Sequence, residues 1–349
     1  MAHEEVVSIN QIHEYRKGYR PFHTPNINGN STVDLLFQPL LGGTIQETKM
    51  GKMILPQQLS MWFFRGQNKE YQNWNASIFR EPIIMDSFDI ETRTFYRELQ
   101  LREFELLIND MPRVKDWRNK GFCINVEALA QHYGLYTTMI DITNNFDVAL
   151  FFACCKYEYE INGYRPLTQN DINEPHSQYG IIFRTSVFGQ YVANNKPQQA
   201  IIPIGYQPYS RPQNQCGFII CDAENNNIPD YGFELKIEFK HDLDYSKKIF
   251  DEFDGGEKIF TKADFSPLEQ HVLNIRDAKS FSIEAFEKTC DELNYPKPKM
   301  QNDFNKKGIS IGAKPYDLSI EEMESIDKDW DFDSFIKKCG IMLREFKIL

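Results

Sequence analysis

An arginine in the run Phe64-Arg65-Gly66-Gln67 is the residue whose position most suggests chemistry. It follows the apolar segment Met61-Trp62-Phe63, where a guanidinium is costly to bury unless it meets an anion or several acceptor oxygens. Gly66 lets a second backbone or a ligand approach closely. The run therefore predicts an anion-binding position. The structural alternative is that Arg65 satisfies buried carboxylates or helix-end carbonyls.

A second run, Gln131-His132-Tyr133-Gly134, is followed by Asp141 and by the apolar segment 148–153. The glycine ends a short helix, and the apolar segment is too hydrophobic to face water. Together the two runs predict a pocket. Each residue keeps a structural alternative: His132 can lie at a helix end, where the dipole favours a protonated ring, and Asp141 can cap a helix or pair with Arg65.

Composition limits the class of protein. At 349 residues the chain suits about two domains, or one domain with additions, and its 41% hydrophobic content is that of a globular protein. The net charge of −11 argues against a general polyanion-binding surface and leaves a local basic patch open. No stretch reaches the roughly 18 apolar residues of a membrane span, and the start lacks the regions of a signal peptide. We expect a cytoplasmic protein that does not contact a membrane.

The cysteines and histidines give no sign of a metal. The seven cysteines are scattered without a CxxC pair and lie mostly in apolar segments, as reduced packing residues do. The seven histidines show no HExxH or HxxxH spacing. We expect no bound metal.

The sequence predicts both helices and strands around the two runs. We expect an irregular extension over residues 1–50 with one short helix from Thr32, an α+β domain over 51–240, and a helical portion over 241–349. Within the domain the pattern predicts a strand over 59–64, helices over 91–109 and 146–157, and a short helix capped by Asn125. Strands are expected at 180–183, 200–204, 217–221 and 233–240.

The last hundred residues carry helix-start signals. Ser266-Pro267-Leu268-Glu269 and Ser319-Ile-Glu-Glu322 each place a capping glutamate three residues after a serine. Ile283, Phe286, Cys290 and Leu293 mark one face of the helix between them. The two prolines in residues 296–303 make that segment the best candidate for a linker.

Three pieces in order resemble the FRG domain family, which is named for its Phe-Arg-Gly motif. They are Trp62–Gln67 with Trp74 and Ser77–Arg80 downstream, then Leu129–Leu135 leading to Asp141 and Val148–Ala153, and finally Arg211–Phe218. The resemblance covers roughly residues 55 to 220. FRG domains are found in bacteria and phages, often near defence genes, and have been likened to the ADP-ribosyltransferase fold. The resemblance thus implies a split, mixed or antiparallel sheet with packed helices.

By the same resemblance the expected ligand is NAD, used as a substrate in a toxin or phage-defence setting, with a protein or nucleic-acid acceptor. The chain has neither GxGxxG nor GxxxxGK[ST], so NAD would bind without a Rossmann or P-loop motif. Breaking the nicotinamide bond creates an oxocarbenium-like cation, which needs a nearby carboxylate, an anchored pyrophosphate and a held ribose.

These needs assign roles to the candidate residues. Asp141 would stabilise the cation or take a proton, and Gln215 would orient a group without acting as a base. Arg65 would anchor a phosphate or ribose bidentately. The catalytic candidates are Asp141, His132 and Gln215, and the binding candidates are Arg65, Gly66, Gln67, Tyr133, Thr143, Arg80 and Arg211. Arg80 and Arg211 are also typical of solvated or bridging arginines, and Tyr133 of a core residue.

One position departs from the family pattern. Family members usually read Pro-Thr-Arg-Leu-Leu-Asp-Trp where this chain reads Tyr136-Thr-Thr-Met-Ile-Asp-Ile142, so Thr138 replaces an expected arginine. The replacement removes a cation from the expected site. It favours a rival function, in which the pocket recognises a nucleotide, a nucleic-acid end or a protein without catalysis.

Overall fold

A mixed sheet is the centre of this α+β protein. The computed structural model describes residues 3–19, 43–48, 51–56, 62–71, 76–80, 88–158, 160–186, 201–221, 233–261 and 266–338. Within these ranges seven strands form the sheet, in the order β1-β11-β8-β4-β5-β10-β9. The strands are β1 (His3–Val7), β4 (Trp62–Gln67), β5 (Met139–Thr143), β8 (Tyr179–Ser186), β9 (Ile201–Pro203), β10 (Gly217–Cys221) and β11 (Leu235–Lys240).

Strand β1 is parallel to β11, whereas the other neighbouring strands of the sheet are antiparallel. Three smaller pairs accompany the sheet. They are β2 (Gly43–Thr48) with β3 (Gly51–Pro56), β6 (Cys155–Glu158) with β7 (Gly163–Pro166), and β12 (Ser280–Phe281) with β13 (Ser310–Ile311).

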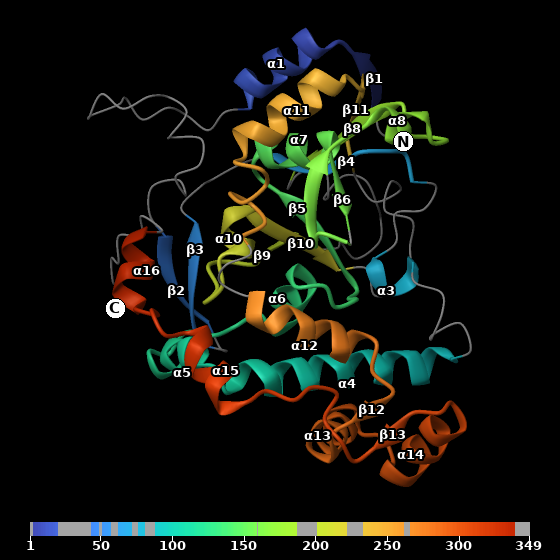
Figure 1. Ribbon diagram of the computed structural model, residues 1–349, viewed down its shortest axis with the longest axis vertical. Helices are drawn as coiled ribbons and strands as arrows, with labels where there is room; N and C mark the ends of the chain where they lie inside the picture. The colour runs from blue at the N-terminus through green and yellow to red at the C-terminus, as the bar shows by residue number, and fades with distance from the viewer. Residues whose placement is uncertain are drawn as a thin grey trace.

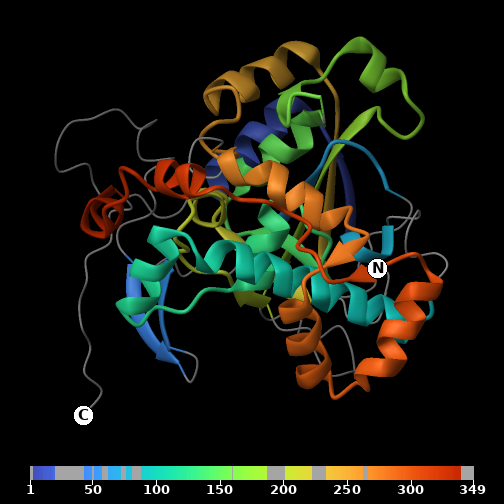
Figure 2. The ribbon, with the colours of Figure 1, turned by 60° about the horizontal axis from the view of Figure 1, so that its bottom comes forward.

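Helices cover both faces of the sheet. Their bounds are α1 (Ile9–Gly18), α3 (Ser77–Arg80), α4 (Ile90–Asn109), α5 (Pro112–Asn119), α6 (Val126–His132), α7 (Phe146–Cys154), α8 (Gln169–Asn173), α10 (Arg211–Asn214), α11 (Leu243–Glu252), α12 (Ser266–Arg276), α13 (Ile283–Leu293), α14 (Lys297–Lys306), α15 (Ile320–Ile326) and α16 (Phe332–Lys338). Figure 1 shows α1, α7 and α11 above the sheet and α4, α12 and α13 below it. The long helix α4 and α12 lie side by side in Figures 1 and 2.

The clusters that cover the two faces of the sheet follow from the alternation of side chains along the strands. Phe64 and Ile182 pack with α7 and α11, whereas their neighbours Phe63 and Ile181 pack with α4 and α13 on the opposite face. Because both faces are covered, the strand Tyr179–Ser186 is apolar over consecutive residues.

Strands β4 and β5 are joined at one register position. β4 pairs with β8 from Trp62 to Gln67, but with β5 only at Phe64 and Thr143. Beyond that position β4 and β5 diverge. The divergence leaves the Arg65–Gln67 part of β4 without a neighbouring strand on that side.

Glycine at position 66 is required by the close packing of α7. A Cβ atom at Gly66 would lie 1.7 Å from the carbonyl oxygen of Ala149, and one at Gly180 of β8 would lie 2.9 Å from the carbonyl oxygen of Ala153. Helix α7 therefore lies directly on the backbones of two strands. Its residues are buried almost all round, as its uniformly apolar sequence predicts.

Most elements predicted from the sequence are confirmed. Helix α4 spans Ile90–Asn109, Asn125 caps α6, and α7 begins at Phe146. The strands predicted in the second half are β8, β9, β10 and β11. The capping box of Ser319 and Glu322 is present at the start of α15. The short helix predicted from Thr32 lies outside the described residues.

Four predictions are wrong. The helix predicted over 146–157 ends at Cys154, and residues 155–158 form the strand β6. The first fifty residues are not wholly irregular, because they contain β1, α1 and β2; β1 pairs with a strand more than 200 residues away, so no local pattern marks it. Residues 297–306 form α14 instead of a linker, since Pro298 sits in the first turn, where its missing N–H costs no hydrogen bond. Ile283 is 57% exposed, so it does not belong to the buried face of α13.

Replacing Gly66 by alanine should destabilise the protein strongly. The new methyl group would overlap a helix carbonyl that cannot move without displacing α7, so we expect a loss of about 3 kcal/mol or more, or failure to fold. Urea denaturation measures the change. The control is Gly18→Ala at the end of α1, where the added carbon would meet no atom within 4 Å beyond its chain neighbours and its own helix backbone; an equal loss in both variants would contradict this role of Gly66.

Candidate functional site

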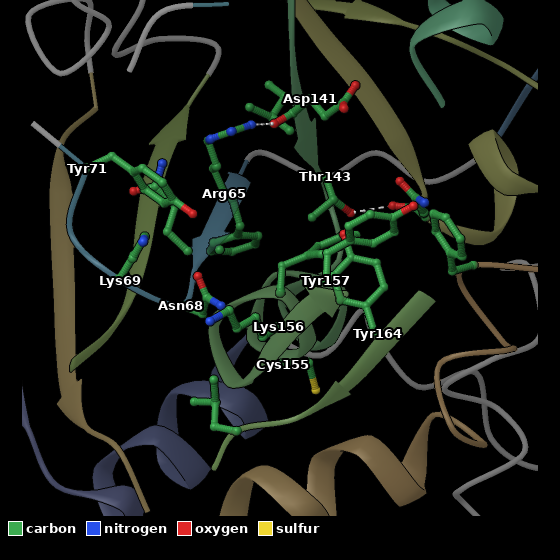
Figure 3. Close-up of a pocket in the computed structure, with 18 of the residues that line it drawn as sticks. Arg65, Asn68, Lys69, Tyr71, Asp141, Thr143, Cys155, Lys156, Tyr157 and Tyr164 are labelled. Carbon is green, nitrogen blue, oxygen red and sulfur yellow. Dashed lines mark hydrogen bonds between the residues drawn. The ribbon is translucent and has the colours of Figure 1, made fainter. Parts of the chain in front are cut away.

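A pocket of about 470 Å³ lies where β4 and β5 diverge. This volume is within the range of roughly 300–1,000 Å³ that is usual for small-molecule sites. Strand β4 contributes Arg65, Gly66 and Gln67 to its wall, and β5 contributes Asp141 and Thr143. In Figure 3, Arg65, Lys69 and Tyr71 lie on one side of the pocket, and Tyr157 and Tyr164 lie on the other.

Arg65 bridges the two diverging strands with its side chain. Its guanidinium donates a hydrogen bond of 2.7 Å to the main-chain carbonyl of Asp141 (Figure 3). This bond connects β4 and β5 just past their single paired position. Arg65 thus has the carbonyl-satisfying role that the sequence left open, at a strand instead of a helix end, and it also lines the pocket.

His132 and Asp141 face each other across one wall. His132 is the last residue of α6, and its Nε2 lies 4.0 Å from Oδ1 of Asp141. The His132 side chain is 2% exposed, whereas that of Asp141 is 41% exposed. Neither His132 Nε2 nor Asp141 Oδ1 has a hydrogen-bond partner within the described structure, although both are buried. The two unpartnered polar atoms thus face each other at the wall of the pocket.

The imidazole of His132 is held in its neutral form. Burial lowers the pKa of His132 below its ordinary value, and the nearby Arg211 cation lowers it further, while Asp141 and Gln215 act in the opposite direction. The protonated helix-end histidine that the sequence left open is therefore disfavoured. A neutral imidazole can accept a proton, which suits a general base.

Three of the other candidate residues also line the pocket. Gln67 is 6% exposed, and its Oε1 is buried without a hydrogen-bond partner in the described structure. Thr143 donates from its hydroxyl to the carbonyl of Gln215 at 2.8 Å. The Gln215 amide donates to the carbonyl of Ile259 at 3.1 Å, so its orientation is fixed by the backbone.

Arg211 and Tyr133 lie outside the pocket wall. Arg211 is 2% exposed and donates to the carbonyls of His132 and Thr261 and to the carboxylate of Glu269. The Tyr133 ring packs under its guanidinium. Arg211 has the bridging role that the sequence left open. The side chain of Arg80 lies outside the described residues.

A scan against protein-family models matches residues 60–161 to the FRG domain. The chain contains an FRG domain. No curated protein and no solved structure matches the chain. The matched range includes β4, α6, β5 and α7, and so it supplies Arg65, Gly66, His132 and Asp141 to the pocket.

The position where the FRG pattern expects an arginine is accounted for locally. The hydroxyl of Thr138 donates to the carboxylate of Glu127 at 3.2 Å. Glu127 also forms an ion pair of 3.0 Å with Arg97 of α4. Thr138 is not among the residues that line the pocket.

The pocket also contains residues that the sequence analysis did not identify. An aromatic wall, formed by Tyr157 and Tyr164 of the β6–β7 hairpin and by Phe260, has ring centroids 5.4–5.7 Å apart. Phe260 lies far outside the range that matches the FRG domain. The Asn162-Gly163 turn and the tyrosines around it were the available signal for the hairpin. No local signal marks Phe260, because a loop brings it to the pocket.

The charged residues at the pocket are mostly paired. Lys156 contacts Asp171 at 2.7 Å and Glu174 at 3.0 Å, and Lys69 lies 3.6 Å from Glu174. Among the described residues no group of three His, Cys, Asp or Glu could hold a metal ion. No helix in the described ranges is long and apolar enough to cross a membrane.

The burial of His132 should appear in the pH dependence of stability. The unfolded chain binds a proton at His132 near its ordinary pKa of 6.5, whereas the folded chain resists protonation down to its lowered pKa. Stability from this residue is therefore fully present above pH 6.5 and decreases as the pH falls below it. We expect His132→Gln to lose less stability than the wild type between pH 7 and pH 5.5, measured by urea denaturation.

The exposed His3 provides the control. The variant His3→Gln should lose as much stability as the wild type over the same pH range. An NMR titration that finds His132 protonated at pH 7 in the folded protein would contradict the assignment.

Proposed function

We propose that the FRG-domain pocket binds NAD and cleaves its nicotinamide glycosidic bond, transferring ADP-ribose to a protein or nucleic-acid acceptor or to water. The observation that carries the proposal is the pairing of a buried, neutral His132 with Asp141 on the wall of a nucleotide-sized pocket. An aromatic wall stands in the same pocket, where flat rings can stack.

The chemistry needs one carboxylate and one base. The bond between ribose C1′ and the nicotinamide nitrogen breaks, its electron pair neutralises the pyridinium, and a cation develops at C1′. Asp141 would stabilise that cation, since its side chain is partly open to the pocket. His132 would take the proton from the attacking oxygen or nitrogen. Arg65 and Gln67 would hold the phosphate or ribose.

The proposed setting follows from the family. We propose that the protein acts in the cytoplasm of a bacterium as a toxin or a phage-defence effector. Its activity on NAD or on a macromolecular acceptor would then harm the cell or the infecting phage.

A second function is favoured by the charge balance of the pocket. The two lysines that line it, Lys69 and Lys156, have carboxylate partners, and Thr138 replaces the arginine that the family pattern expects. A pyrophosphate would find few unpaired cations there. The alternative is therefore a recognition module that binds a nucleotide, a nucleic-acid end or a protein without turnover.

Replacing Asp141 by asparagine distinguishes the two functions. The change keeps the size of the side chain and its main-chain bond to Arg65 but removes the negative charge. For an enzyme we expect ADP-ribose to bind as in the wild type and NAD turnover to fall by about 100-fold or more. Calorimetry measures binding, and release of nicotinamide or transfer of labelled ADP-ribose measures turnover.

The matched control is Asp333→Asn in the first turn of α16, an exposed aspartate away from the pocket. It should behave as the wild type. Binding of ADP-ribose without turnover in the folded wild type would instead support the recognition module. Folded protein that neither binds NAD or ADP-ribose nor transfers label would reject the proposed activity.

A further inference from the structure

A continuous set of hydrogen bonds joins the aromatic wall of the pocket to the wall that carries His132. The hydroxyl of Tyr157 donates to the side-chain oxygen of Asn162, whose amide donates to the carboxylate of Glu269. The other oxygen of that carboxylate accepts from Arg211, and Arg211 donates to the carbonyl of His132 at 3.2 Å. The chain thus runs from the aromatic wall to the wall that carries His132.

Glu269 is the central group of this network. It lies in the first turn of α12, more than 100 residues beyond the range that matches the FRG domain, and its side chain is 14% exposed. Each carboxylate oxygen has its own donor, one from Asn162 and one from Arg211. The sequence suggested only a capping role for Glu269. The structure directs its carboxylate to two other parts of the fold, and the side chain of Ser266, with which the sequence predicts a capping box, lies outside the described residues.

The network is supported by the backbone conformation of Asn162 and by ring contacts of Arg211. Asn162 has φ +43°, a left-handed conformation that asparagine tolerates better than most residues, and its side-chain amide donates to Glu269. Arg211 is clamped between two rings, with its guanidinium carbon 4.4 Å from the centroid of Tyr133 and 3.8 Å from that of Phe260. Phe260 itself belongs to the aromatic wall. The network therefore meets the aromatic wall at two points.

We propose that Glu269 is a positioning residue that fixes the separation between His132 and the aromatic wall. The identity of the ligand in this inference rests on the proposed function. The coupling of the two walls is independent of that function. A ligand whose ring stacks on Tyr157 and Phe260 while its reacting atom faces His132 requires both walls at a defined distance. Glu269 supplies that distance from a part of the chain outside the matched domain.

The test uses full-length protein with Glu269→Gln. Arg211 and Asn162 donate to different oxygens of Glu269, so in the amide one of these two donors would face an NH2 group, which cannot accept its hydrogen bond. We expect faster hydrogen–deuterium exchange at both the end of α6 and the β6–β7 hairpin, and ADP-ribose binding weaker by about 10-fold or more, as for other outer supporting groups. The control is Glu321→Gln, an exposed first-turn glutamate of α15, which should change neither.

A second variant, Asn162→Gly, cuts the network at the hairpin only. Glycine accepts the left-handed conformation, so the fold should persist; exchange should rise in the hairpin but not in α6, and ADP-ribose binding should weaken. If Glu269→Gln does not fold, the exchange and binding measurements on Asn162→Gly test the proposal in its place.

The outcomes separate this inference from the proposed function. Exchange in Glu269→Gln that changes at one wall only, or unchanged ADP-ribose affinity in a wild type that binds it, would overturn the positioning role. If the wild type binds no ADP-ribose, the proposed ligand is wrong, and the exchange data alone decide whether Glu269 couples the walls.

Discussion

The close contact between helix α7 and the backbone of β4 is the constraint on which the rest of the structure depends. It requires a glycine at position 66, because the carbonyl of Ala149 occupies the space of a side chain. With α7 seated there, one face of the sheet is covered and the strand leading into α7 ends beside β4. The glycine of the FRG motif is therefore explained by packing, whereas the arginine beside it serves the gap between the strands.

The divergence of β4 and β5 creates the space that the pocket occupies. A continuous ladder would have consumed the main-chain groups of both strands and left no cavity between them. The single paired position at Phe64 and Thr143 keeps the sheet together, and the side chain of Arg65 replaces part of the missing ladder. The same arginine thus supports the wall that it lines. A structural and a ligand-binding role of Arg65 are compatible here.

Local patterns in the sequence predicted the elements that depend on local forces. The cap at Asn125 and the start of the apolar helix α7 are set by neighbouring residues, and they were predicted correctly, whereas the end of α7 was not. Strand β1, the position of Asp141 on a central strand, and the contribution of Phe260 depend on partners far away in the chain. The motifs located His132 and Asp141, but only the fold shows that Glu269 and Arg211 support the pocket from behind.

The parallel pairing of β1 with β11 has a consequence for the order of folding. His3 is aligned with Leu235 and Val7 with Phe239, so the strand near the start of the chain has no partner until residue 239 has been made. During synthesis the main-chain groups of β1 therefore stay without their partner strand until more than 200 further residues have emerged from the ribosome. Closing so long a loop is slow, and the edge of the sheet is therefore completed late.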